Sequence, residues 1–205
     1  MFSLLLIFTL AMSCIARAEQ HIWRDDVLVF GAYEQDGDFY NGSESIYWII
    51  TDIDEFSRTF TVVSMYLLDC TQYHSSTRTT SWANTDLNRW LQSEFVPSAF
   101  SGAERSYIRS VSIPSERDIR RYFTDYRCRP TQYAIQRGVY HYENGGKITG
   151  SYWLRLNQSS KWGVFVGVQG GIYDHGNQVT VTDNGVRVMM TLSLDLDWDS
   201  VQIYP

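Results

Sequence analysis

The residues best suited to chemistry form an aromatic and polar group around a predicted loop in the last third of the chain. They are Trp162, Tyr173, Asp174, His175 and Asn177. Aromatic faces beside hydrogen-bonding groups are the mixture that binds sugars, peptides and other polar ligands. An ordinary polar turn has a similar composition, so both interpretations stay open.

Motifs for catalysis and metal binding are sparse. None of the histidines has another histidine at ligand spacing, so zinc is not indicated, and we expect neither a metal nor a cofactor. The sequence also lacks the serine-hydrolase, phosphate-loop and dinucleotide-binding motifs. Asp36-Gly37-Asp38 resembles the start of a calcium loop, but the later EF-hand ligands are missing, which favours an ordinary turn. Paired carboxylates have no fixed sequence spacing, so a carboxylate-dependent hydrolase stays an alternative.

Two arginines, Arg155 and Arg187, lie inside apolar, strand-like runs. A buried guanidinium is too costly to keep without partners, and its five donors can bind acids or carbonyls on neighbouring strands. We therefore predict a structural role for both, rather than ligand contact. Trp153, two residues before Arg155, is predicted to lie in the core.

The first residues of the chain have the pattern of a secretory signal. Residues 4–15 are apolar, and Ala16-Arg17-Ala18 offers a small-x-small cleavage site. We predict a signal peptide at residues 1–18 and a single domain at residues 19–205, in a secreted, periplasmic or cell-envelope protein. Lipoprotein anchoring through Cys14 is the minor alternative. No later segment is long and apolar enough to span a membrane.

Removal of that signal would leave Cys70 and Cys128. An oxidising compartment permits a disulfide between them, whereas the sequence cannot show whether the two thiols lie within bonding distance, so both states stay open. Metal binding by these cysteines is disfavoured, because two thiols make an incomplete zinc site.

Composition narrows the class of partner. The formal net charge is −6, so a nucleic-acid backbone or an anionic membrane would be repelled. Hydrophobic residues make up 44% of the 205 residues, which is ample for one core, and the aromatic content of 15% is typical of a β-rich chain.

The pattern of apolar residues changes along the chain and predicts an α+β protein. The first third predicts a three-stranded antiparallel unit at 27–33, 46–53 and 60–67. The middle third predicts short helices: one from Asn84 or Thr85 to Pro97, one from Ser101 through Ile108, and others at 115–123 and 131–137. The last third returns to strands at 151–156, 162–169, 178–182 and 186–196.

Several short motifs, taken in order, resemble a bacterial family catalogued as domain of unknown function 6273. They are Phe30-Gly31-Ala32-Tyr33-Glu34-Gln35-Asp36, Trp48-Ile49-Ile50, Leu68-Asp69-Cys70, Leu87-Asn88-Arg89-Trp90-Leu91, Cys128-Arg129-Pro130-Thr131, Tyr152-Trp153-Leu154-Arg155 and Gly185-Val186-Arg187. The resemblance covers roughly residues 27–192. It implies a C-type-lectin-like fold with mixed antiparallel sheets, related to formylglycine-generating enzymes and to variable proteins of diversity-generating retroelements. It implies no activity.

Export, the absence of a catalytic motif and the aromatic loop together favour a binding module whose surface loops meet a glycan, peptide or protein. The alternatives are the carboxylate-dependent hydrolase and a cell-envelope structural protein, so whether the protein is an enzyme stays open, with binding favoured.

Overall fold

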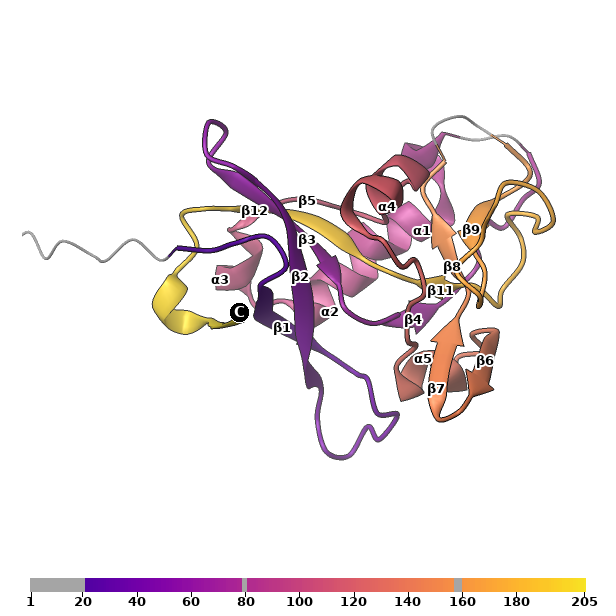
Figure 1. The fold of residues 1–205 in the computed structure, drawn as a ribbon, viewed down its shortest axis with the longest axis horizontal. Helices are drawn as coiled ribbons and strands as arrows, with labels where there is room; N and C mark the ends of the chain where they lie inside the picture. The colour runs from indigo at the N-terminus through magenta and orange to yellow at the C-terminus, as the bar shows by residue number, and fades with distance from the viewer. Residues whose placement is uncertain (1–20, 79–80, 157–159) are drawn as a thin grey trace, which may run out of the picture.

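The structure is a computed structural model that describes residues 21–78, 81–156 and 160–205 (Figure 1). The predicted signal peptide and Cys14 lie outside these residues. The described chain is a mixed α+β fold with mostly antiparallel sheets, as predicted. None of its helices has the length and apolar character needed to cross a bilayer.

The larger sheet has six strands in the order β13-β1-β2-β3-β12-β5, and all neighbours are antiparallel. The strands are β1 (Val27–Tyr33), β2 (Glu44–Asp54), β3 (Thr59–Ser64), β5 (Ile108–Ser112), β12 (Met189–Ser193) and β13 (Gln202–Tyr204). The predicted three-stranded unit is therefore confirmed as β1-β2-β3.

The smaller sheet has five short strands in the order β10-β9-β8-β11-β4, with β8 and β11 parallel. They are β4 (Asp69–Cys70), β8 (Tyr152–Leu154), β9 (Val164–Val166), β10 (Ile172–Tyr173) and β11 (Gly185–Val186). A separate hairpin joins β6 (His141–Asn144) to β7 (Lys147–Gly150). Figure 1 shows this hairpin below β8 and β9 and next to α5.

The helices occupy the middle third, as predicted. They are η1 (Trp82–Asn84), α1 (Asp86–Trp90), the π-helical turn η2 (Leu91–Phe95), α2 (Val96–Ala99), α3 (Gly102–Arg105), α4 (Glu116–Tyr122) and α5 (Gln132–Gln136); η3 (Trp198–Ser200) lies near the end. Ser101 and Ser115 form complete capping boxes at α3 and α4, in which the N3 carboxylate accepts from the cap N–H.

The helix from α1 to α2 has one continuous buried face, made by Leu87, Leu91, Phe95 and Ala99 at intervals of four. The prediction that Pro97 ends this helix is wrong, because the chain stays helical to Ala99. A π-type bond from the Val96 N–H to the Leu91 carbonyl widens the turn just before the proline. Such a bulge relieves the clash that a proline ring makes with the preceding turn.

Three other boundaries differ from prediction. The helix that begins after Ser101 ends at Arg105, and Ile108 already belongs to β5. Residues 178–182 form a turn with one isolated bridge between Gln178 and Trp162. The run 186–196 is divided, because Val186 pairs in the smaller sheet as the last residue of β11, whereas Met189–Ser193 pair in the larger sheet as β12.

Arg187 lies at the crossing of the chain between the two sheets, and its side chain contacts both. Its Nε donates to the Ser64 carbonyl at the end of β3, at 3.1 Å, and its Nη1 lies 3.4 Å from the Tyr152 hydroxyl on β8. The guanidinium also lies over the Phe123 ring, 4.3 Å from its centroid. This buried cation is thus held by a carbonyl, a hydroxyl and aromatic faces.

Candidate functional site

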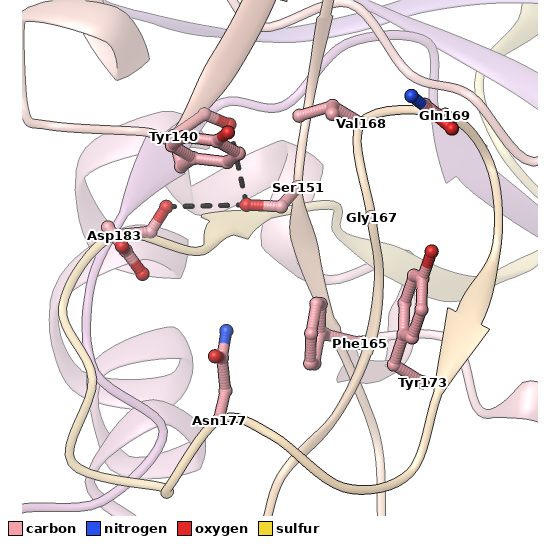
Figure 2. A pocket seen from close by; sticks show the side chains of 9 residues that line it. All are labelled: Tyr140, Ser151, Phe165, Gly167, Val168, Gln169, Tyr173, Asn177 and Asp183. Atoms are coloured by element: carbon pink, nitrogen blue, oxygen red, sulfur yellow. Dashed lines mark hydrogen bonds between the residues drawn. The ribbon is translucent and has the colours of Figure 1, made fainter.

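A pocket of about 470 Å³ opens where the β6–β7 hairpin meets the loops around β9 and β10 (Figure 2). Its lining combines aromatic rings, uncharged polar side chains and one carboxylate: Tyr140, Ser151, Phe165, Gly167, Val168, Gln169, Tyr173, Asn177 and Asp183. Pockets for small polar ligands have this composition, in which apolar faces supply contact area and a few polar groups fix orientation.

The aromatic wall is a stacked pair, Phe165 and Tyr173, with ring centroids 5.3 Å apart and planes inclined by 22°. The Phe165 ring also packs edge-on against the buried Trp153, which fixes the stack to the core. Antiparallel pairing of β9 with β10 places the two residues opposite each other. Tyr173 is 47% exposed, so one face of the stack is supported by protein while part of the tyrosine stays accessible to a ligand.

Two glycines lie close against the Tyr173 ring. A Cβ atom on Gly167 would lie 2.7 Å from Cε2 of Tyr173, and one on Gly171 would lie 3.0 Å from its hydroxyl. The loop closes through a hydrogen bond from the Gly167 N–H to the Gly171 carbonyl, at 2.8 Å. The absence of side chains here lets the ring lie flat along the backbone.

Most of the polar groups lie on the Phe165 side of the stacked pair (Figure 2). Figure 2 shows the Asn177 amide pointing from its loop into the space between Asp183 and Phe165. The Ser151 hydroxyl is buried and donates weakly to the Tyr140 and Asp183 carbonyls, at 3.4 and 3.5 Å. The side chain of Asp183 is exposed at the pocket rim and supplies acceptors only. A ligand that both donates and accepts hydrogen bonds fits this wall.

The predicted loop group divides in two. Tyr173 and Asn177 line the pocket, whereas Trp162, Asp174 and His175 do not. Trp162 is half-buried beneath the Lys161 ammonium, 5.7 Å from its ring. Asp174 and His175 contact each other at 2.9 Å on the surface, and the hydrogen bond from His175 lowers the pKa of Asp174.

The residues predicted as structural lie in or beside the core. Trp153 is fully buried and donates its indole N–H to the Thr71 carbonyl at 2.9 Å. Arg155 is partly buried, with its Nη2 3.7 Å from the Asp118 carboxylate that caps α4. It therefore links the end of β8 to the start of that helix.

Cys70 and Cys128 are both buried free thiols, so the disulfide left open by the sequence is not formed in this structure. The Cys70 thiol lies 3.2 Å from the Thr182 carbonyl, and the Cys128 thiol lies 3.5 Å from the Met65 carbonyl. Burial, with Asp69 and Asp183 nearby, raises the pKa of Cys70 to about 12, and burial also raises the pKa of Cys128. Such thiols are poor nucleophiles at neutral pH.

We expect iodoacetamide at about pH 8 to leave Cys70 and Cys128 unmodified in the folded protein and to alkylate both after denaturation, because only the thiolate reacts. Peptide mass spectrometry measures the two sites separately. Since the Cys70 pKa is raised on folding, its contribution to stability is present at neutral pH and is lost as the pH rises above 9.0, where the unfolded thiol ionises. Rapid labelling of Cys70 in the native protein would contradict its burial.

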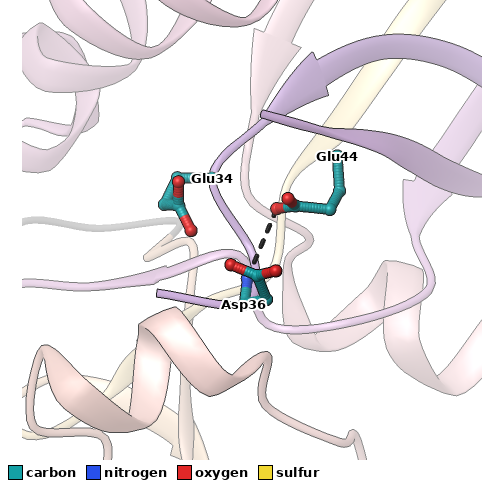
Figure 3. Close-up of side chains that lie close together, drawn as sticks. All are labelled: Glu34, Asp36 and Glu44. Atoms are coloured by element: carbon teal, nitrogen blue, oxygen red, sulfur yellow. Dashed lines mark hydrogen bonds between the residues drawn. The ribbon is translucent and has the colours of Figure 1, made fainter. Parts of the chain in front are cut away.

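An acidic cluster lies at a distance from this pocket, in the loop between β1 and β2 (Figure 3). Carboxylate oxygens of Glu34, Asp36 and Glu44 all lie within 4.8 Å of one another, the spacing that a metal ion needs. These oxygens also organise the loop, since Glu34 accepts from the Gly37 N–H at 2.6 Å and Glu44 from the Gln35 N–H at 2.7 Å. Backbone and side-chain hydrogen bonds, first that from Asp38, lower the pKa of Asp36.

Comparison with known proteins concerns the middle of the chain. Residues 57–125 match the family model described as Domain of unknown function (DUF6273). The matched segment extends from the turn before β3 to the loop after α4, and it includes Leu68-Asp69-Cys70 and the capped helices. No curated protein and no solved structure matches the chain. The pocket residues, from Tyr140 to Asp183, lie after the matched segment.

Sequence reasoning missed much of the pocket wall, including Tyr140, Phe165 and Gln169. The signal that was available is the β6–β7 hairpin, whose Asn144-Gly145-Gly146-Lys147 segment is a strong two-residue turn pattern. Register then places Tyr140 opposite Ser151, on one face of the hairpin. The stacking of Phe165 on Tyr173 has no comparable local signal, because it depends on a pairing of very short strands.

Proposed function

We propose that this protein is an exported binding module whose pocket takes an uncharged glycan. The observation that carries the proposal is the partly exposed Tyr173 ring, stacked on Phe165, with the Asn177 amide on the Phe165 side of the pair. A sugar has apolar C–H faces that pack on aromatic rings, and hydroxyls around its edge that donate and accept hydrogen bonds.

The charge of the pocket lining distinguishes neutral from acidic glycans. Asp183 is the one carboxylate among the lining residues that the structure describes, and no cationic side chain lines the pocket with it in that part of the chain. An acidic sugar or a phosphate would therefore meet a like charge, whereas a neutral sugar can donate hydroxyls to the carboxylate. This favours neutral over acidic glycans.

The predicted signal peptide and the family match also support the proposal. The signal-like residues 1–18 support a secreted, periplasmic or envelope location, which is where an extracellular glycan would be met. The match to residues 57–125 and the two mostly antiparallel sheets with central helices support the C-type-lectin-like scaffold and the bacterial origin that the motifs imply. The hydrolase alternative has less support, because glycosidases pair two carboxylates across the scissile bond and the described pocket lining holds one.

The test is a calorimetric and array screen of the full chain against glucose, N-acetylglucosamine and mannose oligosaccharides, with a random peptide library as the second arm. We expect saturable binding to at least one neutral series, with a dissociation constant on the order of micromolar to millimolar, since a shallow site captures few contacts. The acidic counterparts should bind more weakly. Binding to peptides alone, or to nothing at millimolar concentration, would contradict the proposal.

A further inference from the structure

The pocket continues onto the face of the β6–β7 hairpin. Thr149 on β7 donates its hydroxyl to the Val168 carbonyl at 2.7 Å, and Val168 lines the pocket. The antiparallel register places Tyr142 directly opposite Thr149, so both side chains lie on the same face of the hairpin. Tyr142 therefore lies on the face that borders the pocket.

Two exposed tyrosines, Tyr140 and Tyr142, lie on the same face of this hairpin. Tyr140 lines the pocket, and Tyr142 lies two residues further along the same strand direction, so their Cβ atoms share a face about 7 Å apart. Tyr140 is 60% and Tyr142 is 51% exposed, so both rings are accessible to a ligand at that surface.

The rest of the face suits the same ligand chemistry. Alternation along the two strands places six side chains on it, and they are aromatic or polar with a single cation at the tip: Tyr140, Tyr142, Asn144, Lys147, Thr149 and Ser151. His141 and Glu143 belong to the opposite face. A strip of rings with hydrogen-bonding groups between them matches a chain of sugars, each with apolar and hydroxyl surfaces.

We propose that the ligand is a linear, uncharged oligosaccharide that extends from the Tyr173 pocket along the hairpin, with Tyr142 as the aromatic platform of a second subsite. This inference rests on the glycan function proposed above. The two subsites make affinity depend on chain length, because a longer ligand gains the second platform without a second loss of translational freedom.

The test measures the dissociation constant for the monosaccharide through the pentasaccharide of the glucose, N-acetylglucosamine and mannose series. In the series that binds, we expect affinity to rise at least roughly tenfold with length, and Tyr142→Ala to remove most of that rise. Tyr204→Ala is the matched control, because Tyr204 is a strand residue of the other sheet with 49% exposure, and it should keep the full rise. Thermal melting shows whether each variant is folded.

The outcomes separate the two proposals. Binding that does not change with chain length, or a length dependence that survives in the folded Tyr142→Ala protein, would overturn the second subsite and leave the pocket proposal standing. Absence of binding by every sugar would overturn both. Displacement of the sugar by an extended peptide that requires Tyr142 would assign the hairpin face to a peptide and overturn the second subsite.

Discussion

Arg187→Ala is expected to lower the free energy of unfolding by about 4 kcal/mol, the upper part of the range for large-to-small changes in a core. The substitution removes a side chain that is 3% exposed and lies between Phe123 and Tyr152. It also leaves the Ser64 carbonyl without its bond from the guanidinium. The side-chain contact that Arg187 makes between β3 and β8 is lost with it.

The variant Arg187→Met distinguishes the contribution of packing to stability from that of hydrogen bonding. Methionine can fill most of the space between the rings and avoids burying a charge, so this variant should lose roughly 1–2 kcal/mol, mainly through the unpaired carbonyl. Urea denaturation followed by circular dichroism measures both variants. Arg120→Ala is the control, since Arg120 pairs with Glu116 on the exposed side of α4, and its unfolding curve should coincide with that of the wild type. Equal stability of Arg187→Ala and wild type would contradict the role of Arg187 as the link between the sheets.

Tyr173→Ala is expected to weaken binding of the neutral oligosaccharide about 30-fold, which corresponds to about 2 kcal/mol for an aromatic residue at the centre of a site. Truncation removes the exposed platform, and the Phe165 face that it uncovers lies one ring spacing, 5.3 Å, further back. Tyr173→Phe keeps the stack on Phe165 and should stay within about threefold of the wild type, because it loses only a hydroxyl. Isothermal titration calorimetry measures each constant.

Gly167→Ala tests the position of the same ring without removing it. The added methyl group would lie 2.7 Å from the Tyr173 ring, so the ring must move away from its stacked position. Binding should weaken in the folded variant. If Tyr173→Ala and Gly167→Ala both bind as well as the wild type, the ring has no part in recognition.

Local patterns in the sequence predicted the scaffold well. Thr85, Ser101, Ser115 and Thr131 begin helices because their hydroxyls accept backbone N–H groups three residues on, which is a short-range interaction. Gly138 follows α5 with a φ of 107°, as a helix-ending glycine should. Such signals need no knowledge of the tertiary structure.

The pocket could be predicted only in part, since long-range pairing assembles it. Tyr173 and Asn177 were found from their residue types, but Tyr140 reaches the pocket through the hydrogen bond of its N–H to the Asp183 carbonyl, far along the chain. Ile108 was predicted to end the helix that the Ser101 capping box begins. That helix ends at Arg105, and pairing with β12 makes Ile108 the first residue of β5. Nothing in the local sequence distinguishes these outcomes.

The most direct test of the account is a titration of isotope-labelled full-length protein with the neutral oligosaccharide that binds best, followed by backbone amide NMR. The account predicts shift changes that saturate together and are confined to residues 140–151, 163–178 and 183–185, with the largest at Gly167 and Tyr173. Changes centred instead on the acidic loop of Glu34, Asp36 and Glu44, or none at saturating ligand, would contradict it.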